Sequence, residues 1–343
     1  MGNIFDEKIE DLKIMGSTKT KEGQKKIQKK DPIKQESLTW LSDHPWMGIF
    51  TLIFFYIIFL YVPTMLYQLF ASSPTFRIYH IIDFFGVAFY FLLVVPLIFG
   101  LPTNRGYKDN CESSRVFHFK PIYRTIVLGI LSAIVLTACM LLSSYLAVVI
   151  GQEGAMLFDP SLLVNPLTTN IYTSLKPGIW EEVAFRGIIL VLLLRKYSKK
   201  TAIIVNGVLF GLFHAVNLLF MLLNAIFFEV EPDRVAMVGT LFQIVYTMFF
   251  GFFLAYLFIK ANSLIPCIIA HYLVDALSTL VATDQNVNLW LFWIFATVIG
   301  FGMLPAKLNI LIVRASCYTW PQPFDEQVKS FDTFLARKQI KSK

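Results

Sequence analysis

Charged residues are scarce in this sequence. Asp, Glu, Lys and Arg together make up 15% of its 343 residues, whereas a soluble domain usually carries about a quarter. Hydrophobic residues make up 56%, with 33 Phe among them, and they come in long unbroken runs. Such runs lack the regularly spaced polar residues that form the solvent face of a soluble helix. The composition therefore excludes an ordinary soluble protein and predicts an integral membrane protein.

The long apolar runs have the length that a bilayer requires, which is about 20 residues per helix. They are too continuous for strands of an outer-membrane barrel, in which polar and apolar residues alternate. We therefore predict an all-α fold, a polytopic membrane helical bundle of about eight transmembrane helices. The predicted spans are residues 46–69, 79–101, 123–150, 167–194, 201–225, 235–259, 262–282 and 288–312.

Lys and Arg are distributed unevenly over the segments that connect these spans. Every second connection is basic, as are the segments before the first span and after the last. This pattern predicts that both termini are cytosolic. We expect a basic, disordered cytosolic tail (1–45), a transmembrane domain (46–312) and a basic cytosolic tail (313–343). The net charge of +7 fits anionic lipid headgroups, so no nucleic acid partner is expected, and the plasma membrane and endoplasmic reticulum both stay open.

Cysteine is scarce as well, with four residues in the chain. Cys139 and Cys267 lie in predicted spans, and Cys111 and Cys317 lie on predicted cytosolic segments. None falls on an outer loop, so structural disulfides are not expected.

The few ionisable residues inside the spans are clustered. Glu181, Glu182 and Arg186 lie in the fourth span, His214 in the fifth, and His271 and Asp275 in the seventh. Glu182 and Arg186 are four residues apart and share a helix face, so we expect them to pair. Glu181 points about 100° away from Glu182 and is free for another task.

These residues are also predicted to lie at similar depths. Glu181 is 14 residues from Arg195 and His214 is 14 residues from Lys200, which places both about 21 Å from the cytosolic charges at about 1.5 Å per residue. His271 and Asp275 are 11 and 15 residues past Lys260, or about 16 and 22 Å. We therefore predict one site within the bilayer.

Single polar residues in a span often serve only as hydrogen-bonding contacts between helices. We assign that role to six residues: His80, Asp83, Asn206, Asn217, Asn224 and Gln243. Two adjacent acids, an Arg and two His at one depth are too costly to bury for helix packing alone, so we interpret that set as functional.

Three motifs carry a resemblance to a known family. Glu181-Glu182-x-x-x-Arg186, Phe210-x-x-x-His214 and His271-x-x-x-Asp275 follow one another on successive helices. Together they resemble the CPBP family of intramembrane proteases, which includes the type II CAAX prenyl proteases and the bacteriocin-processing Abi proteins. The resemblance covers a motif core of about residues 120–312.

The resemblance implies a protease that hydrolyses a peptide bond without a cofactor. Glu181 and His214 would bind and activate the attacking water, and His271 and Asp275 would stabilise the tetrahedral oxyanion. Glu182, Arg186 and Phe210 would support the site or contact the substrate. The substrate would be a membrane-associated peptide, either a prenylated CAAX protein or a precursor peptide. Many family members have Asn where this chain has Asp275, whose carboxyl group must then be protonated or must orient His271.

Three other readings stay open. His214, His271 and either Glu181 or Asp275 can also supply ligands for a catalytic zinc ion, although no His-Glu-x-x-His motif is present. A membrane scaffold or immunity factor of the same fold would need none of these side chains. A transporter can use buried Glu and His to relay protons.

Overall fold

The computed structural model describes residues 44–70, 84–95, 122–151, 156–158, 174–228, 231, 234–278, 281–283, 293–300 and 302–319. All of them fall in one unit of the chain, Leu38–Lys343. Nearly all of the amino-terminal tail and the end of the carboxyl-terminal tail lie outside the described residues, as do His80, Asp83 and Cys111. What was predicted for those segments stays a prediction.

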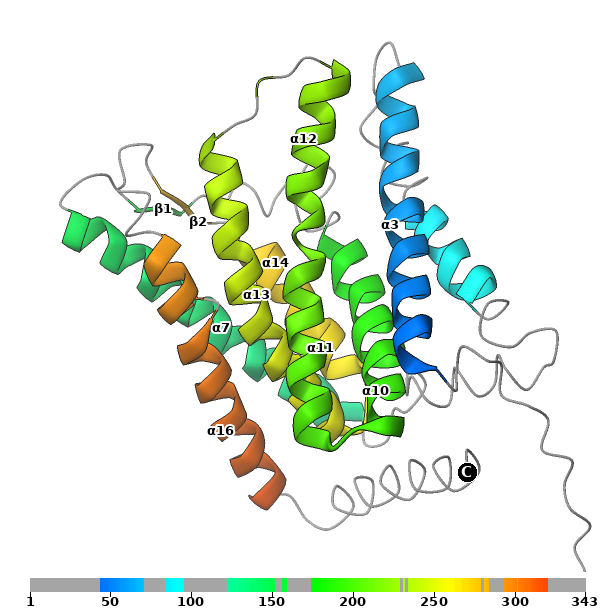
Figure 1. Ribbon diagram of the computed structural model, residues 1–343. Helices are drawn as coiled ribbons and strands as arrows, with labels where there is room; N and C mark the ends of the chain where they lie inside the picture. The colour runs from blue at the N-terminus through cyan, green and yellow to red at the C-terminus, as the bar shows by residue number, and fades with distance from the viewer. Residues whose placement is uncertain are drawn as a thin grey trace, which may run out of the picture. The chain divides into compact units, whose positions relative to one another are not determined.

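Helices account for almost all of the described residues, and each of the eight predicted spans contains helix (Figure 1). This confirms the prediction of an all-α membrane bundle, while the number of membrane crossings stays a prediction. The helical elements are α3 (Pro45–Phe70), η1 (Tyr90–Val94), α7 (Ile122–Gly151), η2 (Pro177–Glu181), η3 (Val183–Ile189), α10 (Leu190–Lys196), α11 (Lys199–Phe213), α12 (Val216–Phe228), α13 (Arg234–Ala261), α14 (Ile265–Ser278), η4 (Ala296–Gly300) and α16 (Met303–Thr319).

Two details differ from the expected pattern. A two-stranded antiparallel ribbon, β1 (Met156–Phe158) with β2 (Val281–Thr283), pairs Leu157 with Ala282. Helix α16 continues to Thr319, past the predicted end of the last span at 312. Neither changes the helical class of the fold.

Four described helical segments are long and apolar enough to cross a bilayer: Ile122–Gly151, Lys199–Phe227, Arg234–Ala261 and Trp293–Val313. Shorter apolar helices run over Pro45–Tyr61, Phe84–Val94 and Ile265–Ser278. Large apolar side chains point outward from several helices, including Phe54 at 61% exposure and Ile226 at 71%. Because water would disfavour such a surface, the chain is an integral membrane protein whose outer side chains face lipid.

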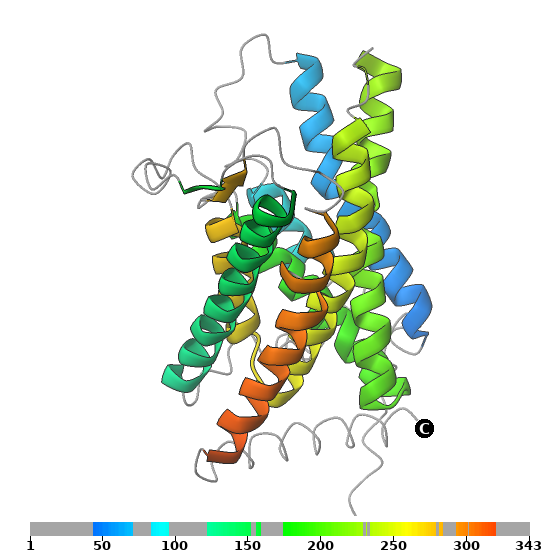
Figure 2. The same ribbon diagram turned by 90° about the vertical axis from the view of Figure 1, so that its left-hand side faces the viewer.

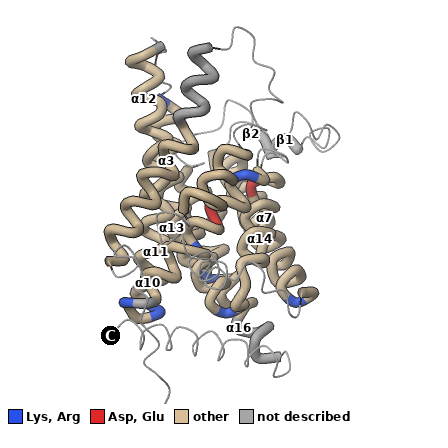
Figure 3. Tube along the Cα trace, turned by 90° about the vertical axis from the view of Figure 1, so that its right-hand side faces the viewer, with Lys and Arg blue, Asp and Glu red and all other residues tan. Residues whose placement is uncertain are grey.

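Most Lys and Arg residues of the described helices lie near one end of the bundle (Figure 3). Lys196 ends α10, Lys199 and Lys200 begin α11, and Lys260 lies in the last turn of α13. Helices α7 and α16 lie side by side as well (Figure 2).

Helices α11 and α13 make the most extensive contact in the bundle because glycines let their backbones approach. A Cβ atom on Gly251 would lie 2.8 Å from the Cα of Gly207. A Cβ on Gly211 would lie 2.5 Å from the carbonyl oxygen of Ile244. This close packing holds the end of α11, where the second motif lies, directly against α13.

Candidate active site

The first motif lies on a helix that is wound more loosely than an α-helix. The π-helical segments η2 and η3 lie on either side of Glu182, and π turns are frequent at functional sites. The carbonyl oxygen of Phe185 accepts a hydrogen bond from Asn206 Nδ2 of α11 at 2.7 Å. Asn206 therefore joins two helices, in the role that the sequence predicted, and it braces the π-helical segment that carries Arg186.

Glu182 is the centre of a buried ionic cluster. Its Oε1 accepts a hydrogen bond from Nη1 of Arg186 at 2.8 Å, so the predicted pair is present. The same oxygen lies 2.7 Å from Nδ1 of His271 on α14. The side chains of Glu182 and Arg186 are both 0% exposed. Buried charges are stable only when they are paired and hydrogen-bonded in this way, so Glu182 links the first motif to the third.

His214 lies at a break that the sequence did not predict. The segment 201–225 was expected to be one helix, but α11 ends at Phe213 and α12 begins at Val216. The backbone N–H of His214 bonds to Gly211, which leaves the carbonyl oxygen of Phe210 to the imidazole Nδ1, 2.9 Å away. Because a carbonyl only accepts, Nδ1 carries the proton and Nε2 keeps its lone pair in the neutral ring.

His271 is oriented by carboxyl groups on both sides. Its Nδ1 faces Glu182, and its Nε2 lies 3.4 Å from Oδ2 of Asp275, one helical turn further along α14. Asp275 is the more open of the two carboxyls, with a side chain that is 35% exposed. The pair is close enough for Asp275 to orient the imidazole.

Phe210 is in contact with an ionisable group from each of the three motifs. Its ring is edge-on to the ring of His214 at 5.0 Å and to that of His271 at 5.9 Å between centroids. The guanidinium of Arg186 lies 4.2 Å from the Phe210 centroid, which is cation–π geometry. The fully buried Phe210 ring thus packs against both imidazoles.

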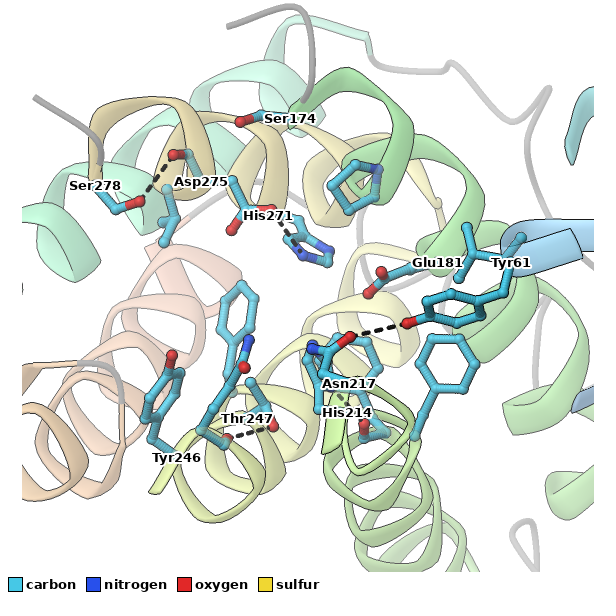
Figure 4. A pocket seen from close by; sticks show the side chains of 17 residues that line it. Tyr61, Ser174, Glu181, His214, Asn217, Tyr246, Thr247, His271, Asp275 and Ser278 are labelled. Carbon is cyan, nitrogen blue, oxygen red and sulfur yellow. Dashed lines mark hydrogen bonds and ion pairs between the residues drawn. The ribbon is translucent and has the colours of Figure 1, made fainter. Parts of the chain in front are cut away.

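A cavity of about 390 Å³ collects the predicted reactive groups (Figure 4). Glu181, His214, His271 and Asp275 all line it, as does Phe210, whereas Glu182 and Arg186 lie behind its wall. Within the part of the chain that the structure describes, Oε2 of Glu181 and Oε2 of Glu182 are both buried without a hydrogen-bond partner. Oε1 of Glu182 bonds to Arg186 and His271, whereas Glu181 lines the cavity. The two adjacent glutamates therefore face different surroundings, as their helical spacing predicted.

Sequence reasoning missed much of the polar lining of this cavity. Asn217 makes the predicted contact between helices, with Tyr61 of α3, but it also lines the cavity, as does Gln243. The cavity is also lined by residues with hydroxyl groups. These residues belong to no recognisable sequence motif, and residues of this kind are common in membrane helices. They are Tyr61, Ser174, Tyr246, Thr247 and Ser278.

The arrangement provides what hydrolysis needs: a carboxyl group with an unpartnered oxygen, an imidazole lone pair, and a second imidazole oriented by carboxyls. No group of three or more His, Cys, Asp or Glu arranged to hold a metal ion is found among the described residues. The zinc reading thus lacks a preformed ligand set in that part of the chain.

Residues 163–277 match a family model described as "Type II CAAX prenyl endopeptidase Rce1-like". The matched segment includes all seven residues singled out from the motifs, and it confirms the family predicted from them. Comparisons with curated proteins and with solved structures gave no match.

Proposed function

We propose that this chain, which belongs to the Rce1-like type II CAAX prenyl endopeptidase family, is an intramembrane endopeptidase. One observation carries the proposal: Glu181, His214, His271 and Asp275 line a single cavity in a bundle whose outer face is apolar. The substrate is a membrane-associated peptide, which the family relation makes either a prenylated CAAX protein or a precursor peptide.

Glu181 and His214 activate the attacking water in this proposal. Nε2 of His214 accepts one hydrogen bond from the water, because Nδ1 already donates to the carbonyl of Phe210. The carboxylate of Glu181 removes the proton as the water oxygen bonds to the scissile carbonyl carbon. Glu181 lines the cavity and has a buried oxygen, Oε2, without a hydrogen-bond partner, and both observations support this role.

His271 stabilises the oxyanion that forms when the carbonyl π electrons move to oxygen. Since Nδ1 donates to Glu182, an N–H at Nε2 requires the imidazolium, whose charge is balanced by Glu182 and Asp275. A fixed charge in a dry site stabilises such an oxyanion far more than water does. Asp275 acts as an orienting group in this scheme, at 3.4 Å from Nε2.

Collapse of the tetrahedral intermediate completes the reaction. Glu181 returns its proton to the nitrogen of the scissile bond, the C–N bond breaks, and the amine leaves. The products are a carboxylic acid and an amine, and Glu181 is again a carboxylate. Glu182, Arg186 and Phe210 keep the imidazoles in place and take no proton from the substrate.

The test is cleavage of a membrane-inserted fluorogenic peptide by purified protein in liposomes. Wild-type protein should cleave the peptide, and Glu181→Gln should not, while both show the same thermal unfolding. Glu231→Gln is the matched control, because Glu231 is an exposed carboxylate outside the cavity. Near-normal turnover by Glu181→Gln would show that the glutamate mechanism is wrong.

A further inference from the structure

The break after α11 positions a second polar side chain beside the proposed catalytic groups. Asn217 lies in the first turn of α12, and its backbone N–H donates to the carbonyl oxygen of His214 at 3.0 Å. Residues three apart share a helix face, and both side chains line the same cavity. The break that exposes His214 therefore also brings Asn217 to the reaction site.

The amide of Asn217 is held in one orientation. Its Oδ1 accepts a hydrogen bond from the hydroxyl of Tyr61 on α3 at 2.8 Å. The Tyr61 ring rests against the ring of Phe220, one turn along α12, with centroids 5.1 Å apart. With Oδ1 engaged by Tyr61, the amide turns its nitrogen toward the middle of the cavity (Figure 4).

A peptide cleaved in this cavity needs such a donor. The scissile bond must lie in an extended segment, whose backbone N–H and C=O groups have lost their intrahelical partners. Leaving such a group unpaired away from water costs several kcal/mol, roughly 2–7 by transfer measurements. A primary amide presents the donor and acceptor of a peptide group. It can therefore bind the substrate backbone whatever side chains the substrate carries.

We infer that Asn217, oriented by Tyr61, binds the substrate backbone by donating from Nδ2 to a peptide carbonyl beside the scissile bond. This inference rests on the proposed peptidase function and adds a substrate-positioning residue to it. The contact forms in the bound substrate and persists through the reaction, so it lowers KM and leaves kcat unchanged. The alternative is that Asn217 only joins α12 to α3.

The experiment combines enzyme variants with a modified substrate. Asn217→Leu removes both donors, Asn217→Asp removes them with little change of size, and Tyr61→Phe removes only the orienting hydroxyl. Asn224→Leu is the matched control, since it removes an amide two turns further along α12 that does not line the cavity. Substrates carry a thioamide at one of the backbone positions flanking the scissile bond, because sulfur is the weaker acceptor.

The expected result is about a tenfold rise in KM for Asn217→Leu and Asn217→Asp with kcat unchanged, as for the loss of one hydrogen bond. Tyr61→Phe should raise KM about threefold, and Asn224→Leu should leave it unchanged. At one position the thioamide should raise KM for the wild type and have no further effect in Asn217→Leu. That missing effect separates a substrate contact from a helix contact.

The inference is overturned if Asn217→Leu keeps the wild-type KM, or if every thioamide affects the wild type and Asn217→Leu equally. Fluorescence anisotropy measures binding of the same peptides to the Glu181→Gln protein, which should not cleave them. This measurement tests the contact of Asn217 with the substrate independently of the proposed peptidase function. Binding that weakens with Asn217→Leu supports the substrate contact even if no cleavage occurs. If the wild type cleaves the peptide but Asn217→Leu does not weaken peptide binding, the peptidase proposal stands and the proposed contact of Asn217 with the substrate is refuted.

Discussion

Nδ1 of His271 lies 2.7 Å from Oε1 of Glu182, a residue 89 positions earlier in the chain. The same oxygen accepts a hydrogen bond from Arg186 at 2.8 Å. One carboxylate oxygen therefore holds a cation from its own helix and an imidazole from another. The orientation of His271 depends on Glu182, although Glu182 does not line the cavity.

This relationship predicts different losses for the two adjacent glutamates. Glu181→Gln should abolish cleavage and leave the unfolding temperature unchanged, because Glu181 makes no ion pair with the residues that the structure describes. Glu182→Gln should lower stability by about 3 kcal/mol, since it leaves the buried Arg186 without its counter-charge, and activity should fall as His271 loses its anchor. Thermal unfolding in detergent and peptide cleavage measure both. Equal stability of Glu182→Gln and the wild type would contradict the role given to the ion pair.

Replacement of Asp275 distinguishes the metal-free glutamate mechanism from a zinc-dependent mechanism. If it orients His271, Asp275→Asn should keep substantial activity, because an amide oxygen also accepts a hydrogen bond. A chelator should then have little effect on cleavage. If Asp275 were a zinc ligand, Asn would be a much poorer replacement, and both Asp275→Asn and chelation would stop the reaction. Recovery of chelated enzyme on addition of one equivalent of zinc would overturn the metal-free mechanism.

The close approach of α11 and α13 predicts that Gly251 tolerates no side chain. A methyl group there would lie 2.8 Å from the Cα of Gly207, and backbone cannot move aside as a flexible side chain can. Gly251→Ala should therefore destabilise the protein by about 1–3 kcal/mol through overpacking. Gly86→Ala is the control, because its Cβ would have nothing within 4 Å. A comparison of the two unfolding temperatures tests the contact, and equal values would mean that the helices can separate freely.

The distribution of Lys and Arg predicts the orientation in the membrane. Reporters inserted between Tyr197 and Ser198, next to the basic ends of α10 and α11, should report the cytosolic side. Reporters inserted at Glu231, between α12 and α13, should report the opposite side. Labelling of both sites from the same side would refute the predicted topology.

The motif residues were predictable because charge is rare in a lipid-facing helix. Glu181, His214 and Asp275 stand out in apolar runs, and the count of residues from flanking Lys and Arg placed them at one depth. The structure adds that they line one cavity. The pairing of Glu182 with Arg186 also followed from spacing, because both lie within one helix.

The rest of the site depends on how separate helices meet. Nothing in the sequence around His214 marks a helix end, since neither Pro nor Gly follows it directly. The hydrogen bond from Tyr61 to Asn217 joins positions 156 residues apart, and Tyr61 lies outside the motif core. Asn217 resembled any polar residue of a membrane helix, and only its place beside the break distinguishes it.

The contacts of Phe210 with His214 and His271 have a consequence for how this site can change. One ring supports the imidazole proposed to bind water and the imidazole proposed to meet the oxyanion. A residue of another size at position 210 should shift both imidazoles together, so a substitution there should affect both halves of the proposed reaction. If the proposed peptidase function holds, a variant with a changed substrate preference should differ on the cavity walls formed by α3, α12 and α13 and should retain Phe210.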